Sequence, residues 1–128
     1  VTPETLLLAV NTERKKAGLP ALVPDERLNR SAQAKCEDQT ARGYYGHISP
    51  SGINGVDTVE DALKPDTGHF GENLAAMQPG QVPELNVIME SWLISPSHKQ
   101  EMLNPKNEIT GFGVSGIYVC EHFYGPND

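Results

Sequence analysis

The hydrophobic pattern changes period near the C-terminus, and this change limits the folds open to the chain. Residues 108–124, EITGFGVSGIYVCEHFY, alternate and are rich in β-branched and aromatic side chains, with Ser115-Gly116 placed for a hairpin turn. The clearest segments before them carry helical spacing instead. Helices first and antiparallel strands last predict an α+β layered domain.

Capping residues mark where the helices begin and end. Thr2 and Pro3 can start the first helix, and Gly18 suits its end. The connector LPALVP should be extended, because each proline biases the residue before it away from helix. A second helix is predicted from Asp25 to about Gly43.

A tryptophan-containing helix precedes the strands. Its predicted span is 83–94, and Leu85, Ile88, Met89 and Trp92 form a helical stripe that should face the core. Ser95 can then cap a new helix with Pro96 in its first position, which ends near Asn104 and carries His98 in its first turn.

The glycine- and proline-rich middle, residues 43–83, is predicted to be mostly loop, with one short helix from Val56 to Leu63. Loops this long in a small domain usually carry function. They hold His47, His69 and Glu72. The chain of 128 residues fits one domain, 1–128.

Charge and hydropathy exclude several classes of partner. The net charge of −7 disfavours nucleic acids and anionic membranes. No apolar run is long enough to span a bilayer, and the first residues do not read as a signal peptide. If the protein is exported, we expect its targeting segment to be missing from this sequence.

Three polar side chains are candidates for a site. His98 lies at a helix start, where the dipole favours a neutral imidazole, the form that binds a metal or accepts a proton. With His47 and Glu72 it would make a three-ligand zinc site with an open position. The spacing is no known metal signature, and on the residues alone hydrogen-bonded surface histidines are the simpler interpretation.

The motifs as a set resemble the CAP superfamily. GHISPSG, GENLA, the tryptophan helix followed by SPSHKQEMLNP, then ITGFGV and EHFYG occur in that family's order, and the N-terminal part is also similar. The family comprises cysteine-rich secretory proteins, antigen 5 and pathogenesis-related proteins of group one, and this form is similar to the bacterial SCP-like extracellular branch. The resemblance covers about residues 4–125.

The resemblance implies an α-β-α sandwich with an antiparallel sheet and a central cleft of two histidines and two glutamates. His47, Glu72 and His98 match three of those positions, so zinc or another divalent cation would be weakly bound. Ser95 stands where animal and plant members carry the second glutamate. His69 could line the cleft, although a solvated loop is the simpler reading. His122 and Trp92 are predicted to be structural.

The two cysteines, Cys36 and Cys120, could form one disulfide or stay as buried thiols. The extracellular habit of the family favours the disulfide.

These observations support three hypotheses. The first is a secreted or surface binding module, expected to be monomeric, that takes a metal, lipid, sterol or peptide ligand in its cleft. The alternative is a metal-assisted hydrolase or protease, with Glu72 as base and His47 and His98 holding the metal. A purely structural interaction domain is the third.

Overall fold

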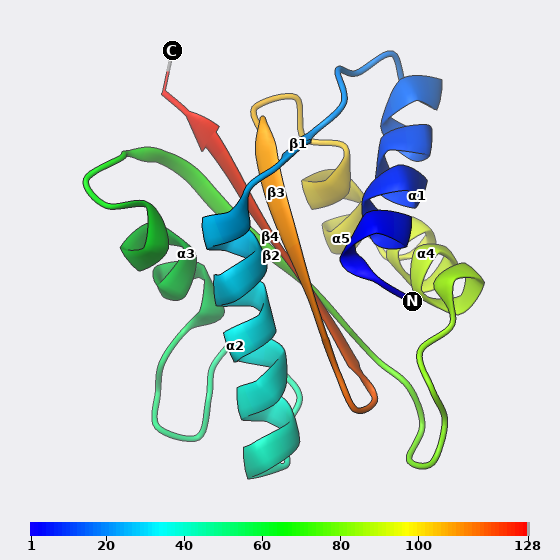
Figure 1. The fold of residues 1–128 in the computed structure, drawn as a ribbon. Helices are drawn as coiled ribbons and strands as arrows, with labels where there is room; N and C mark the ends of the chain where they lie inside the picture. Colours follow the sequence, from blue (N-terminus) through cyan, green and yellow to red (C-terminus); the bar gives the residue numbers. More distant parts are fainter. Residues whose placement is uncertain (128) are drawn as a thin grey trace.

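The chain forms three layers, a central sheet with helices on both faces. The computed structural model describes residues 1–127. Figure 1 shows α2 (cyan) and α3 (green) on one side of the sheet and α1 (blue), α4 and α5 on the other. The helices are α1 Pro3–Lys16, α2 Glu26–Arg42, α3 Gly55–Leu63, α4 Leu85–Ile94 and α5 Pro96–Met102. The strands are β1 Val23–Pro24, β2 Gly68–Ala76, β3 Ile109–Ser115 and β4 Tyr118–Pro126. The expected α-β-α sandwich is confirmed.

The predicted helices are present, and two of the predicted caps work as expected. The Thr2 side chain accepts a hydrogen bond from the backbone N–H of Thr5 at the start of α1. Asp25 caps α2 in the same way, and Gly43 ends it with a left-handed φ of 67°. Ser95 is the N-cap of α5 with Pro96 in the first position, as predicted, but its side chain makes no capping hydrogen bond, because its hydroxyl bonds the His98 ring instead.

The sheet is mixed rather than antiparallel, which corrects the expectation. Its order is β1-β3-β4-β2, and β1 pairs with β3 in parallel. The predicted extended connector supplies β1: the backbone nitrogen of Val23 donates to the carbonyl of Glu108, just before β3, and that of Asp25 donates to Thr110 within β3. Pro24 has no N–H to donate, which an edge strand tolerates.

Strand β2 was not predicted, and it replaces the expected loop over residues 68–76. Its nine residues pair antiparallel with β4, so that Glu72 lies opposite His122 and Leu74 opposite Cys120. Glycines at 68 and 71 hide its alternation. The pairing with β4 is what makes this segment a strand.

Helix α2 lies unusually close to the sheet. A side chain at Gly111 or Gly113 of β3 would collide with the α2 backbone. Glycine at these two positions therefore allows the helix to pack directly on the strand. This close packing brings the polar side chains of α2 within reach of β4.

The tryptophan helix packs as predicted. Trp92 is 1% exposed and lies in one apolar cluster with Phe112, Val119 and Phe123 of the two C-terminal strands. Its indole nitrogen donates to the Leu74 carbonyl at 3.1 Å. The stripe thus buries its largest side chain between α4 and the sheet.

The expected Cys36–Cys120 disulfide is wrong for this structure, where both cysteines are free, buried thiols. They lie together in a small core cluster on α2 and β4, and the Cys36 thiol donates to the Gly113 carbonyl at 3.3 Å. Burial, and then the neighbouring Cys36, raises the pKa of the Cys120 thiol. Because the thiolate is the reactive form, such a thiol is slow to form a disulfide.

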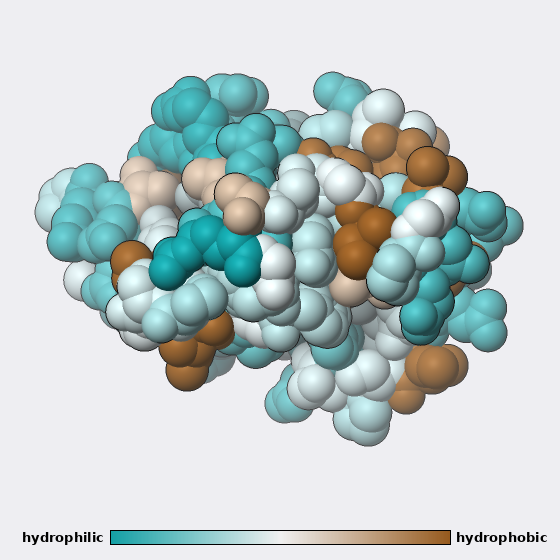
Figure 2. Space-filling model, turned by 90° about the horizontal axis from the view of Figure 1, so that it is seen from below, coloured by the Kyte–Doolittle hydropathy of each residue, from teal (hydrophilic) through white to brown (hydrophobic). Residues whose placement is uncertain are grey.

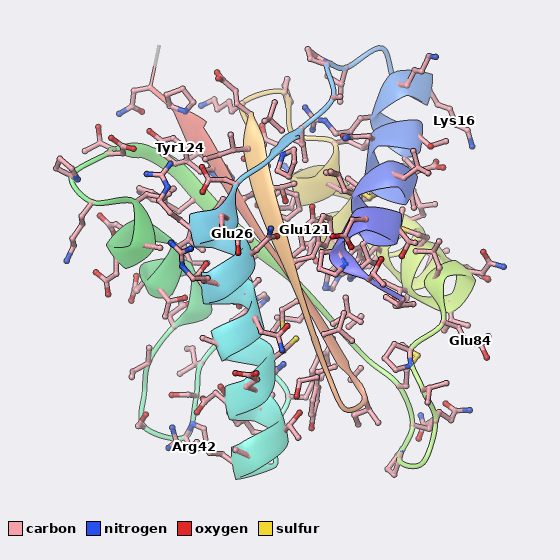
Figure 3. All side chains as sticks on the ribbon, in the orientation of Figure 1. Lys16, Glu26, Arg42, Glu84, Glu121 and Tyr124 are labelled. Carbon is pink, nitrogen blue, oxygen red and sulfur yellow. The ribbon has the colours of Figure 1, made fainter. Side chains whose placement is uncertain are left out.

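A buried carboxyl lies on the opposite face of β4. Figure 3 shows Glu121 inside the molecule, whereas Lys16 and Glu84 point outward. Thr110 donates to its Oε2 at 2.8 Å, and Oε1 has no hydrogen-bond partner within residues 1–127. Burial raises the pKa of Glu121 well above its ordinary value and the nearby Glu101 charge adds to this, while the Thr110 hydrogen bond and the Arg14 charge oppose it only in part.

We expect Glu121→Gln to stabilise the protein at neutral pH. A carboxyl whose pKa is raised by folding contributes stability below its unfolded pKa of about 4.3, and this contribution is lost as pH rises toward its folded pKa. The loss reaches about 1.4 kcal/mol per pH unit in that window. Urea unfolding from pH 4.5 to 8 should show the variant gaining on wild type as pH rises. Glu84→Gln, an exposed control, should change nothing, and parallel pH profiles for Glu121→Gln and wild type would contradict the assignment.

The surface carries apolar residues in separate places. Seen from below, Figure 2 shows brown patches divided by teal and white. Within residues 1–127, every helix is too short or too polar to cross a membrane.

Candidate functional site

A single carboxylate joins two histidines at one edge of the sheet. Glu72 lies on β2, the edge strand, directly opposite His122 of β4. His122 Nε2 is 2.7 Å from Glu72 Oε2, and His47 Nδ1 is 2.8 Å from Oε1. None of the Glu72 side chain is exposed, and Gly55 leaves the space that its carboxylate fills. Each oxygen of Glu72 therefore serves one imidazole.

His47 forms the outer end of this group. Its side chain is 51% exposed, and it stands on the loop between α2 and α3. Two donors hold its carbonyl, Gly55 N at 2.8 Å and Lys35 Nζ at 2.9 Å. Its backbone is therefore fixed while the far side of its ring faces solvent.

The charge of Glu72 decides which ring nitrogens carry hydrogens. Burial alone would raise the pKa of Glu72, but the hydrogen bonds with His122 and His47 and the nearby charge of Lys35 lower it below its ordinary value. An ionised carboxylate only accepts, so His47 must donate from Nδ1 and His122 from Nε2. A neutral His47 then has an unprotonated Nε2 toward solvent.

His122 extends the group into the protein, which the sequence reasoning missed. His122 is fully buried, and its Nδ1 lies 2.7 Å from Ser31 Oγ of α2. Its alternation with Cys120 and Tyr124 made a structural role the simpler prediction. The available signal was the polar run Glu72, His122 and Ser31, which becomes visible only once β2 is paired with β4.

His98 approaches the same edge from α5. The Asn73 side chain donates to its carbonyl at 2.9 Å, and Ser95 Oγ lies 2.7 Å from its Nδ1. Burial lowers the pKa of His98, the charge of His47 lowers it further, and the Leu74 carbonyl opposes them. Ser95 thus contacts the His98 ring from the position where the CAP-like pattern has glutamate.

His69 does not join this group. It lies on β2 rather than in the predicted solvated loop, three residues from Glu72 and so on the opposite face of the strand. Its Nε2 is 2.7 Å from Oε1 of Glu101 on α5, and Asn107 donates to the same oxygen. This half-buried pair links β2 to α5.

The family model for CAP, described as the cysteine-rich secretory protein family, matches residues 7–124. This chain belongs to the CAP family. The match takes in α1 from Leu7 onward, the other four helices whole, and the central sheet up to Tyr124, two residues before the end of β4.

Two curated relatives of this CAP domain come from Bacillus subtilis. It is 34% identical over 118 residues to the uncharacterized protein YkwD, covering 90% of this chain and 44% of YkwD. It is 28% identical to the uncharacterized membrane protein YlbC, covering 92% of this chain and 33% of YlbC. The chain therefore spans less than half the length of these relatives.

Solved structures share its fold. An extracellular protein containing an SCP domain from Bacillus anthracis superposes with a TM-score of 0.84 at 24% identity, covering 96% of this chain and 40% of that one. The outer surface protein of Borrelia burgdorferi gives a TM-score of 0.82 at 22% identity, covering 97% and 92%.

The residues at this edge of the CAP domain meet only some of the requirements of a metal site. Within residues 1–127 no three His, Cys, Asp or Glu side chains come together as a metal site. Glu72 does not fit as a direct ligand, because both its oxygens bond imidazoles. The outward Nε2 of His47 fits as one ligand, with Glu72 behind it as a partner that fixes its tautomer. His98 is the second candidate ligand, and its ring would have to give up the Leu74 carbonyl to bind a metal.

Proposed function

We propose that this CAP domain is a binding module of a secreted or cell-surface protein, and that its open His47–His98 edge takes a divalent cation such as zinc with low affinity. The observation that carries the proposal is the hydrogen bond from His47 Nδ1 to buried Glu72, which leaves Nε2 as the free nitrogen. Two protein ligands leave coordination positions for an oxygen donor of a lipid, sterol or peptide ligand.

The names of two similar structures support the location. One is an extracellular protein and the other an outer surface protein. Free, buried thiols are compatible with both a secreted and a cell-surface location, because Cys36 and Cys120 pack in the core and form no crosslink.

The geometry favours binding over the hydrolase alternative. A catalytic base must reach a water or substrate proton. Glu72 has none of its side chain exposed, and its pKa is lowered by its two imidazole partners against the effect of burial. It is placed to orient His47 and His122 rather than to activate a water.

Zinc titration by calorimetry tests the proposal. At neutral pH we expect weak binding to wild type and at least a roughly tenfold loss in His47→Ala and in His98→Ala, since each removes one of two ligands. His69→Ala is the matched control and should bind as wild type does, because its imidazole pairs with Glu101. Acidification should weaken binding as protons compete for the imidazoles, and His98 should be protonated at a lower pH than an ordinary histidine because its pKa is lowered.

Two results would overturn the proposal. One is zinc binding that survives in the double variant His47→Ala/His98→Ala. The other is wild-type protein that takes up no zinc at millimolar concentration and neutral pH.

A further inference from the structure

The hydrogen-bonded run Ser31–His122–Glu72 ends at a cavity that Ser31 lines. This cavity measures about 290 Å³, near the lower limit for small-molecule sites. Ser31 lines it, together with Lys35, Tyr44, Ile53 and Thr58. It lies between α2, α3 and the loop that carries His47.

The three side chains stand in the order that activates a serine. Ser31 Oγ is 2.7 Å from His122 Nδ1, and His122 Nε2 is 2.7 Å from Glu72 Oε2. Since Glu72 takes the hydrogen of Nε2, a neutral His122 presents a lone pair at Nδ1, and the Ser31 hydroxyl must donate to it. The contact of Ser31 Oγ with the Leu28 carbonyl, at 3.2 Å, is the longer of its two.

The surroundings suit an acyl substrate. Lys35 follows Ser31 by one helical turn, lines the same cavity, and is 6% exposed. Its ammonium bonds the His47 carbonyl and lies 4.9 Å from the centre of the Tyr44 ring. A fixed positive charge in a buried setting favours the negative charge that develops on a carbonyl oxygen under attack.

The geometry points to Ser31 as a nucleophile, activated by His122 and Glu72, that reacts with small carboxylic esters entering this cavity. Ser31 Oγ attacks the carbonyl carbon, and its proton moves to His122 Nδ1. The bond from that carbon to the alcohol oxygen then breaks, and His122 gives the proton to the departing alkoxide. Water releases the acid from the acyl-serine by the same path, with His122 again taking and returning the proton.

This site shares Glu72 with the proposed metal edge, but its nucleophile and its cavity are different, and a covalent probe tests it. The full chain is incubated with a small alkyl fluorophosphonate, digested, and its adduct located by mass spectrometry. We expect the adduct on Ser31, and labelling at least about 100-fold slower in His122→Gln, the size of effect usual for a general base. Ser49→Ala is the matched control: Ser49 lines the same cavity, but its hydroxyl contacts Ser51, so its labelling rate should equal that of wild type.

Wild-type protein alone can overturn the assignment, whatever the variants do. No adduct on Ser31, or an adduct on Ser49 or Tyr44 instead, would do so. A His122→Gln variant with a wild-type circular dichroism spectrum and a wild-type labelling rate would also overturn it. Loss of zinc binding in the metal-edge variants leaves these outcomes unchanged, so the two proposals fail separately.

Discussion

Trp92→Ala is expected to lower the free energy of unfolding by about 3–5 kcal/mol, through lost transfer energy and the cavity it leaves. Trp92 is among the largest fully buried side chains of the described residues and packs in one cluster with α1 and the C-terminal strands. Its indole also satisfies the Leu74 carbonyl on the free edge of β2. The substitution removes packing and one edge contact together.

Urea unfolding followed by circular dichroism measures this loss. Ile94→Ala is the control from the same helix: Ile94 is 76% exposed, and its replacement should cost less than about 0.5 kcal/mol. Equal midpoints for Trp92→Ala and Ile94→Ala would mean that the packing of α4 on the sheet is wrongly described.

Glu72→Ala is the second large expected effect. It should cost at least about 1–3 kcal/mol, the penalty for a buried donor left without its acceptor. Fully buried His122 would lose the acceptor of its Nε2 hydrogen, and Lys35 would lose its neighbouring negative charge. The space beside Gly55 that the carboxylate fills would be left empty.

Glu60→Ala, on the exposed side of α3, serves as the control and should change the stability little. The same unfolding measurement at pH 7 compares the two variants. A Glu72→Ala protein as stable as Glu60→Ala would contradict the description of Glu72 as a buried carboxylate shared by two imidazoles.

The helices could be predicted from the sequence, because the capping residues and periodic apolar stripes that define a helix lie within a few residues of one another. Thr2, Asp25 and Gly43 bound their helices as predicted, and the predicted hairpin turn joins β3 to β4 one residue later than expected, at Gly116 and Ile117. Strand β2 escaped prediction because glycines break its pattern and its pairing with β4 is long-range. The parallel pairing of β1 is also long-range, which is why an antiparallel sheet was expected.

From the sequence, the only residues of the site that could be predicted were those that lie in a family motif. His47 and Glu72 were chosen from motifs and are hydrogen-bonded in the structure. His122 and Ser31 were not, because their contact depends on the close packing of α2 on the sheet, which the glycines of β3 allow. Even the role of Glu72 depends on β4: without His122 beside it, a direct metal ligand was the natural assignment.

The hydrogen positions around Glu72 are the centre of this account, and nitrogen-15 NMR of the histidine rings reads them directly. A long-range proton–nitrogen spectrum at neutral pH should show His47 protonated at Nδ1 with a bare Nε2, and His122 protonated at Nε2 with a bare Nδ1. Glu72→Gln should abolish the His47 preference. A wild-type His47 protonated at Nε2 would contradict the account, because the nitrogen proposed for the metal would then carry a hydrogen.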